Sequence, residues 1–178
     1  MTGSLQSGRV GGARGHVVEV LARGALLLAA TLVLAAPAGA TAPYARQPPP
    51  LSTPWTRSVS ATNPLPDYPR PQLERARWLS LNGQWQYGQG HPGEAPPFGQ
   101  DLPQTVLVPF PIEAPLSGIG REDTYGWYRR TFTVPGSWTG QRVLLNFGAV
   151  AWQSSVYVNG QLAGTHTGDY ESFSLDIT

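Results

Sequence analysis

The chain has 178 residues, a length that suits one domain with short appendages, and only 13% of them are charged. A net charge of +1 excludes the basic footprint typical of nucleic-acid binding, and the absence of cysteine excludes disulfides and thiolate metal sites. The 21 glycines and 18 prolines are too many for a mainly helical protein and favour a turn-rich β fold with an unfolded stretch.

Residues 1–40 have the three parts of a secretory signal peptide. A stretch with three arginines and one acid precedes an uncharged, mainly apolar run at 24–36, and Ala38-Gly39-Ala40 supplies a small-residue cleavage site. The apolar run is shorter than the about 20 residues that a membrane-spanning helix needs. We therefore expect cleavage after Ala40 and a secreted, periplasmic or extracellular protein that has no membrane contact once the signal is removed.

Residues 41–75 are rich in proline and cannot build a core of their own, because such a stretch favours extended polyproline conformations. A linker and an arm lying along the surface of the next domain are both open. A PxxP ligand for an aromatic groove is a third interpretation. Trp55 and Tyr68 suggest that part of the stretch packs against the domain.

From residue 76 onward, short alternating runs are separated by turn signals. The clearest is a central hairpin, where Asn159-Gly160 stands between the runs 156–158 and 161–163 and indicates a type I′ turn. No stretch after residue 40 shows the apolar spacing of an amphipathic helix over three turns. The expected strands, in chain order, are 78–81, 84–87, 104–108, 126–134, 142–147, 156–158, 161–163 and 172–177.

The two-residue period of a strand assigns one face of each run to a core. Trp85 and Tyr87 share such a face in one run, and Leu145 and Phe147 share one in another. Leu144 is expected to point the opposite way. Strands at regular spacing with turns between them predict an all-β fold, an antiparallel β-sandwich or barrel.

Seven motifs follow one another in the second half of the chain: WLSLNGQW (78–85), VPFPIE (108–113), GWYRRTFTVP (126–135), VYVNG (156–160), GTH (164–166), GDY (168–170) and FSLDIT (173–178). In this order they resemble the N-terminal sugar-binding domain of glycoside hydrolase family 2, which includes β-galactosidases, β-glucuronidases and β-mannosidases. The resemblance implies that residues 76–178 form a jelly-roll sandwich of the galactose-binding-domain-like kind. It also implies that this domain is incomplete at its C-terminus, because the family's domain continues past the last motif.

The resemblance further implies a hydrolase that acts on terminal β-linked sugars by the retaining route, and the signal-peptide pattern adds the expectation that this hydrolase is exported. In the family, both catalytic glutamates lie on a barrel that follows an immunoglobulin-like domain. Glycoside hydrolysis needs two facing carboxyl groups, and none of the carboxylates here matches the family's catalytic motifs. We therefore expect no catalytic residue in this chain, which would be a truncated product or fragment, inactive alone, whose partners are the missing C-terminal domains.

Five residues are candidates for sugar contact. The resemblance implies that the loop before the GWYRR strand reaches a sugar pocket, so that Glu122 and Asp123 could accept hydrogen bonds from hydroxyl groups. Tyr125 or Trp127 could stack on a sugar face. Trp152, which follows Ala151 at a place where many members of the resembled family carry an acidic residue, is a further candidate platform. The alternatives are a solvated loop tip for the loop and packing at the sandwich edge for the aromatic residues.

Two other classes of protein remain open. One is a stand-alone, non-catalytic carbohydrate-binding module, and the other is an adhesion or interaction sandwich that binds no sugar. No metal or cofactor is expected, because His91 and His166 are isolated and lack the spacing of metal ligands. Carbohydrate is the expected partner, and nucleic acid is not.

Overall fold

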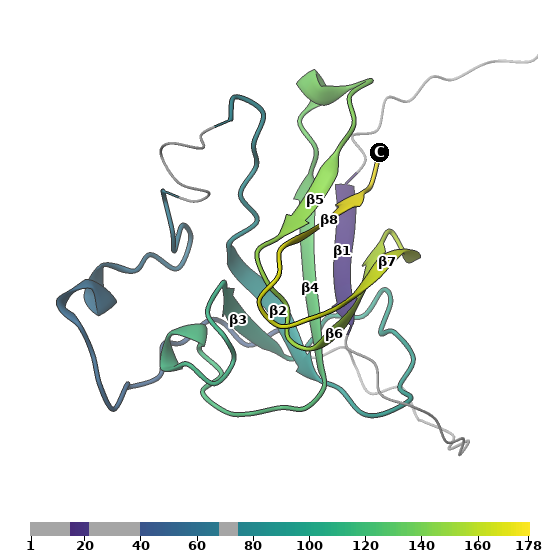
Figure 1. Ribbon diagram of the computed structural model, residues 1–178. Helices are drawn as coiled ribbons and strands as arrows, with labels where there is room; N and C mark the ends of the chain where they lie inside the picture. Colours follow the sequence, from purple (N-terminus) through teal and green to yellow (C-terminus); the bar gives the residue numbers. More distant parts are fainter. Residues whose placement is uncertain (1–14, 22–39, 68–74) are drawn as a thin grey trace, which may run out of the picture.

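The computed structural model describes residues 15–21, 40–67 and 75–178, and the statements below concern these ranges. They form two antiparallel sheets, and no α-helix occurs among them (Figure 1). The strands are β1 (Gly15–Leu21), β2 (Gly83–Gln89), β3 (Gln104–Val108), β4 (Gly126–Thr133), β5 (Leu144–Phe147), β6 (Gln153–Val158), β7 (Gln161–Thr167) and β8 (Phe173–Asp176). The 3₁₀ turns are η1 (Pro54–Ser58), η3 (Pro115–Ser117) and η4 (Gly136–Trp138).

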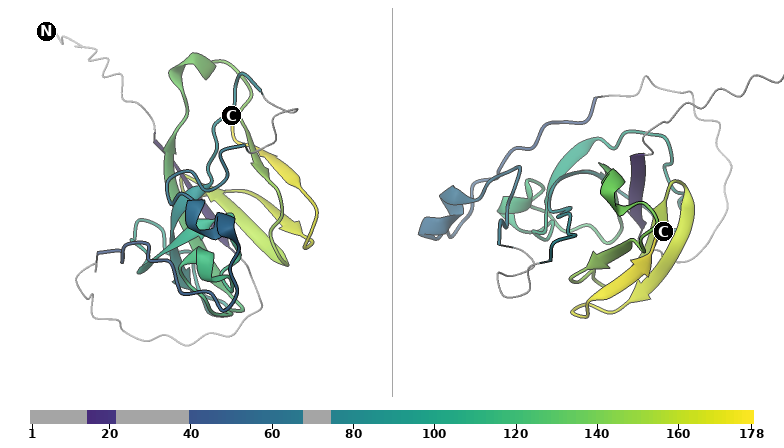
Figure 2. Two further views of the ribbon diagram at one scale, coloured as in Figure 1. Left: turned by 90° about the vertical axis from the view of Figure 1, so that its left-hand side faces the viewer. Right: turned by 90° about the horizontal axis from the view of Figure 1, so that it is seen from above.

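In the described part of the chain, the larger sheet has six strands in the order β3-β2-β4-β1-β6-β7, and β5 pairs with β8 in a second sheet. In the view of Figure 1 the second sheet lies in front of β4, and Figure 2 shows the two sheets from the side and from above. Apolar residues of both sheets share one core cluster. The expected all-β antiparallel sandwich is therefore confirmed, whereas the jelly-roll connectivity stays a prediction.

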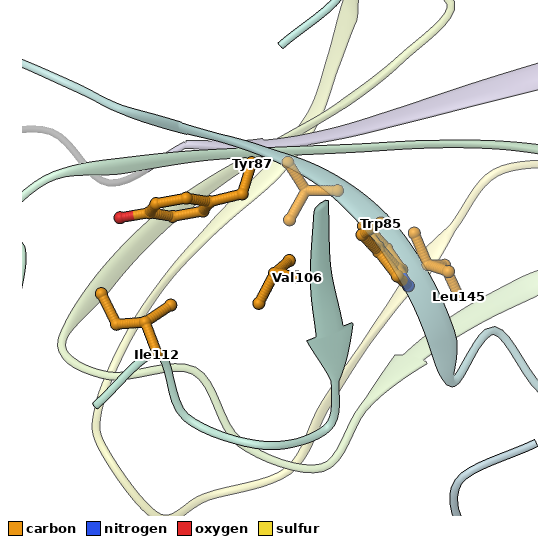
Figure 3. Packing of buried hydrophobic residues seen from close by; sticks show 6 residues of the cluster. Trp85, Tyr87, Val106, Ile112 and Leu145 are labelled. Carbon is orange, nitrogen blue, oxygen red and sulfur yellow. The ribbon is translucent and has the colours of Figure 1, made fainter. Parts of the chain in front are cut away.

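The core lies between the sheets and is built from the alternate residues that the two-residue period selects (Figure 3). Tyr87 and Val106 are fully buried, and Leu145 of the second sheet is 6% exposed, whereas its neighbour Leu144 is 48% exposed. Trp85 is also buried, and its indole nitrogen donates a 2.7 Å hydrogen bond to the carbonyl of Leu81. Burial of this apolar surface is the main stabilising contribution to the sandwich.

The central hairpin is confirmed. Asn159 and Gly160 join β6 to β7 with φ angles of 53° and 78°, as a type I′ turn requires at both central positions. The two strands pair from Val158 and Gln161 at the turn to their far ends, with one irregularity after Val156. The hairpin is therefore longer than the runs that predict it.

The expected strand at 78–81 is wrong, because those residues pair with no strand and Gly83 opens β2 instead of closing a turn. The guanidinium of Arg130 donates to the carbonyl oxygens of Leu81 and Asn82, at 2.8 and 3.3 Å. A side chain from β4 thus satisfies backbone groups that a neighbouring strand would otherwise have to satisfy. Burial lowers the pKa of Arg130 from its ordinary value.

Part of the proline-rich segment lies along the domain as an arm. Ala42 bonds through its amide to the carbonyl of Pro103 and through its carbonyl to the hydroxyl of Thr105, at 2.9 and 2.6 Å. The hydroxyl of Tyr44 donates a 2.9 Å hydrogen bond to the carbonyl of Leu116 in η3. Trp55 is 72% exposed, so Tyr44 anchors the arm where the sequence suggested Trp55.

Strand β1 comes from the segment that the sequence predicts as a signal peptide. It pairs with β4 on one side and β6 on the other, so it lies inside the larger sheet (Figure 1). The apolar run at 24–36 and Tyr68 lie outside the described residues, and the signal peptide stays a prediction. Among the residues that are described, no helix is long and apolar enough to cross a membrane.

Candidate functional site

Several strands of the larger sheet begin or end at the same side. Leu21 at the end of β1 is in register with both Trp127 and Ser155, so β4 and β6 start together. The last residue of β2 pairs with the first of β4, and the last of β7 pairs with the first of β6. Within the described ranges, four loops therefore leave the sheet on this side, which we call the loop end. They are residues 90–103, 117–125, 148–152 and 168–172.

All five residues that the sequence predicts as sugar contacts lie at the loop end. Glu122, Asp123 and Tyr125 belong to one loop, Trp127 follows that loop in β4, and Trp152 directly precedes β6. The fold thus brings together residues from two separate segments of the sequence. Their exposure differs, however, and this decides which of them could contact a ligand.

Asp123 is enclosed, since its side chain is only 2% exposed. Its carboxylate accepts a 2.7 Å hydrogen bond from the hydroxyl of Tyr87 and forms a 2.9 Å ion pair with Arg121. Arg121 also donates to the side-chain oxygen of Gln104 at 2.9 Å. Burial, and then the bond to Asp123, raise the pKa of Tyr87 well above its ordinary value. The network joins the loop to β2 and β3.

Trp127 is enclosed as well, at 8% exposure. Its indole nitrogen donates to the carboxylate of Glu94 at 3.1 Å, and its ring packs with Leu102 and Tyr157. The rings of Phe98 and Tyr157 pack edge to face, and their centroids are 5.3 Å apart. The loop 90–103 therefore covers Trp127 and removes its faces from solvent.

The other candidates face solvent to differing degrees. Glu122 is exposed and Tyr125 is half-buried, while Trp152 is 64% exposed. The carbonyl of Trp152 accepts a 2.8 Å hydrogen bond from the amide of Gly168, so the loops 148–152 and 168–172 are tied together. The loop 168–172 contains Tyr170, a residue that sequence reasoning did not single out. Its side chain is 94% exposed. Its place in the GDY motif was the available signal.

The loop 168–172 is backed by an aromatic stack. The rings of His166 and Phe173 lie 4.1 Å apart and nearly parallel, and the His166 ring nitrogen lies 3.9 Å from the carboxylate of Glu171. Phe173 stacks in turn on Phe147 of the second sheet, at 4.7 Å. The described ranges contain no group of three histidine or acidic residues that could hold a metal ion.

A polar cleft of about 280 Å³ lies elsewhere on the larger sheet. It is lined by Gln84, Gln86, Asp101, Arg129, Arg130 and Thr131. Arg129 forms a 3.1 Å ion pair with Asp101, and the amide of Gln86 donates to the same carboxylate at 2.9 Å. None of the described residues that line the cleft is aromatic, so these residues offer no stacking platform for a sugar.

Comparison with known proteins identifies the family. Residues 65–178 match the family described as "Glycosyl hydrolases family 2, sugar binding domain". The chain belongs to glycosyl hydrolase family 2. This membership confirms the family resemblance of the sequence motifs, and the described strands β2 to β8 all fall within the matched region.

Curated relatives of this family 2 chain are named as glycosidases. It is 36% identical over 82 residues to a β-glucuronidase of Paenibacillus borealis, covering 43% of this chain and 14% of the relative. It is 39% identical over 105 residues to a β-galactosidase of Thermoanaerobacter pseudethanolicus, covering 56% of this chain and 14% of the relative. A Bacteroides ovatus β-galactosidase is 33% identical over 111 residues, which cover 55% of this chain and 13% of that protein. The chain thus spans only a small part of these relatives.

Proposed function

We propose that this chain is the sugar-binding part of an exported family 2 β-glycosidase. The family match and relatives named as a β-glucuronidase and a β-galactosidase support the enzyme class. The signal-peptide pattern of residues 1–40 supports export. The parent enzyme would hydrolyse terminal β-linked sugars by the retaining route, using a pair of carboxyl groups from outside this chain.

The observation that carries the sugar-binding part of the proposal is the pair of exposed aromatic residues at the loop end. Trp152 and Tyr170 are 64% and 94% exposed, and their loops are joined by the hydrogen bond from Gly168. Large aromatic rings usually pack away from water or serve a binding surface. Their flat apolar faces suit the apolar face of a sugar ring, while the indole N–H and the phenol can bond hydroxyl groups.

Exposed carboxylates accompany the two rings. Glu122 and Glu171 lie in loops of the same end, and both are exposed. An ionised carboxylate only accepts hydrogen bonds, so it can receive them from sugar hydroxyl groups. We assign ligand contact to these groups and to Tyr125.

Asp123 and Trp127 would support the site without contacting the ligand. The oxygens of Asp123 already accept bonds from Tyr87 and Arg121, and the ring of Trp127 is covered. We therefore assign them to holding the loop 117–125 in place, so that Glu122 and Tyr125 are presented in a defined position.

Glycan binding by the full chain tests the proposal. Immobilised β-galactosides and β-glucuronides would be probed with the wild type and with Trp152→Ala and Tyr170→Ala. Loss of one stacking ring should weaken binding about 3–10-fold. Trp55→Ala is the matched control, because Trp55 is 72% exposed in η1 and lies outside the loop end. Equal weakening by Trp55→Ala, or no binding by the wild type, would refute the assignment.

A stand-alone carbohydrate-binding module is the second candidate, since exposed Trp152 and Tyr170 would serve it equally well. The two candidates differ in chemistry. Residues 1–178 alone should not hydrolyse a chromogenic aryl β-glycoside under either candidate. The native secreted protein should hydrolyse it only if the chain is part of a glycosidase, and the anomer first released should then retain the β configuration.

A further inference from the structure

Negative charge is concentrated in the four loops of the loop end. These loops hold six of the chain's 11 acidic residues but only one of its 12 lysine and arginine residues. The acids are Glu94, Asp101, Glu122, Asp123, Asp169 and Glu171, and the basic residue is Arg121. The whole chain, in contrast, carries a net charge of +1. Such a concentration of one sign of charge sets the local electrostatic potential, which then favours or disfavours a charged ligand.

The arginines that the structure describes in this region are bound to carboxylates of the protein itself. Arg121 contacts the carboxylate of Asp123 through two of its nitrogens, at 3.1 and 2.9 Å. Arg129, in β4, is 18% exposed and pairs with Asp101 at 3.1 Å. Each guanidinium therefore has its charge balanced within the protein, and neither offers that charge to a ligand.

His166 is likewise enclosed within the protein. Its ring stacks on Phe173, and its Nε2 atom is buried and lies 3.9 Å from the carboxylate of Glu171. A protonated His166 would therefore have its charge balanced by Glu171, and its buried nitrogen would not reach a ligand.

The carboxylates that remain exposed accompany the two rings of the proposed sugar site. Tyr170 has an acidic residue on each side in the sequence, Asp169 and Glu171, and the side chain of Glu171 is 72% exposed. The backbone of Trp152 is hydrogen-bonded to the same loop. Glu122 is exposed as well and forms no ion pair with a described residue. A ligand on these rings therefore lies near negative charge that no described arginine balances.

We propose that the loop end selects sugar residues without a negative charge, such as a β-galactoside, and rejects uronates. The proposed function covers both β-galactosides and β-glucuronides, of which only the glucuronide carries a carboxylate. Hydroxyl groups of a neutral sugar can donate hydrogen bonds to Glu122 and Glu171. These side chains would repel the carboxylate of a uronate, which needs a cation as its partner. The inference rests on the sugar site of the proposed function and adds the charge class of its ligand.

The test compares methyl β-galactoside with methyl β-galacturonide, which differ only in a hydroxymethyl group or a carboxylate on the same ring carbon. Nuclear magnetic resonance titration measures the binding of each sugar to the full chain at about pH 8, where histidine is ordinarily neutral. In about 10 mM salt the galacturonide should bind at least about fivefold more weakly. In about 1 M salt the difference should fall below about twofold, because the Debye length shortens to about 3 Å.

Variants that remove charge test the cause of the selectivity. Glu122→Gln and Glu171→Gln nearly keep the size of the side chain and retain an acceptor oxygen, but they remove its charge. Each should reduce the preference for the galactoside at least about twofold. Asp67→Asn is the matched control, because it removes one charge from an exposed position of the arm and should leave the preference unchanged. The readout is the ratio of two affinities, so a variant that merely lowers the folded fraction does not change it.

Fluorescence quenching measures the electrostatic potential without a sugar. The emission of Trp152 is the difference between the wild type and Trp152→Phe, and that of Trp55 is obtained in the same way. Relative to the neutral quencher acrylamide, the iodide anion should quench Trp152 less than Trp55. Trp55 is the matched residue because it is 72% exposed, against 64% for Trp152, and its turn η1 ends with Arg57 and has no acid in its first turn.

The outcomes separate this inference from the proposed function. Equal affinity for the two sugars would overturn selection by charge while sugar binding stands. A preference that neither salt nor the glutamine variants reduce would overturn it too, and so would equal relative quenching of Trp152 and Trp55. If neither sugar binds, the sugar site is refuted, and the selectivity is refuted with it.

Discussion

The phenolic oxygen of Tyr87 lies 2.7 Å from a carboxylate oxygen of Asp123, which is 36 positions further along the chain. Tyr87 is fully buried in β2, whereas Asp123 belongs to a loop at the edge of the candidate sugar site. The core of the sandwich thus fixes a loop whose neighbouring residues face solvent. This relationship yields the first two predictions.

Replacing Asp123 should destabilise the fold more than replacing its exposed neighbour. Asp123→Ala leaves the buried hydroxyl of Tyr87 and the guanidinium of Arg121 without their shared acceptor, which should cost about 2–4 kcal/mol of unfolding free energy. Glu122→Ala, at an exposed position, should change it by less than about 0.5 kcal/mol. Urea denaturation of both variants measures the difference, and equal midpoints would contradict the structural role of Asp123.

Adding one methyl group at Gly126 should also destabilise the fold. A Cβ atom there would lie 2.8 Å from a ring carbon of Tyr87, and that ring is held by its burial and by Asp123. We expect Gly126→Ala to cost about 1–3 kcal/mol, the usual range for overpacking a core. Gly136→Ala is the control, because a Cβ atom at Gly136 meets nothing within 4 Å. Thermal melts that rank the two variants equally would show that the Tyr87 ring can move aside.

A pH-dependent contribution should come from Asp176. Its carboxylate accepts a 2.6 Å bond from the hydroxyl of Thr178 and a 2.9 Å bond from Arg142. These bonds, that of Thr178 above all, lower the pKa of Asp176 from its ordinary value of 3.8 to about 2. Because the folded state binds this proton less tightly than the unfolded chain, the stabilisation is present above about pH 4 and is lost as the pH falls toward about 2.

Melting of Asp176→Asn at several pH values checks this sign. The variant should melt below the wild type at about pH 6, and the difference should shrink between about pH 4 and pH 2. Asp67→Asn, at an exposed position of the arm, should show no such convergence. A difference between Asp176→Asn and the wild type that stays constant down to about pH 2 would count against the proposed cause.

The turn of the central hairpin should tolerate glycine but not a branched side chain. Asn159 has a φ angle of 53°, which costs a β-branched residue about 1–2 kcal/mol. In urea denaturation, Asn159→Val should therefore lower the free energy of unfolding, whereas Asn159→Gly should leave it within about 0.5 kcal/mol of the wild type. If both variants unfold at the wild-type midpoint, the turn does not set the register of β6 and β7.

The parts of the fold that sequence could predict are those that short-range signals determine. Asn159-Gly160 predicts its hairpin because both turn positions need a left-handed backbone, and alternation places Trp85 and Tyr87 in the core. The run 78–81 has the same local pattern but no strand beside it, since pairing depends on distant residues. Arg130 takes the place of the missing strand there.

The candidate site, too, could be predicted from the sequence only in part. Sequence could place five residues near one another through motif order, but exposure depends on which loop covers which side chain. Trp127 is hidden by the loop 90–103, and Asp123 is closed by Tyr87, which lies far away in sequence. Tyr170 was missed because the sequence does not show how far a loop side chain is exposed, and that of Tyr170 is 94% exposed.

The position of β1 in the sheet also bears on the order in which synthesis, folding and cleavage of the chain occur. Leu21 is in register with Ser155, so roughly 130 residues must be synthesised before the first strand can meet its last neighbour. Contacts between such distant segments form late in folding, because closing the long loop between them costs chain entropy before the contacts can stabilise the sheet. An N-terminus that is cut early would never reach the sheet, whereas one that is cut late would have to be extracted from it. The order of cleavage and folding would then decide which form of the protein accumulates.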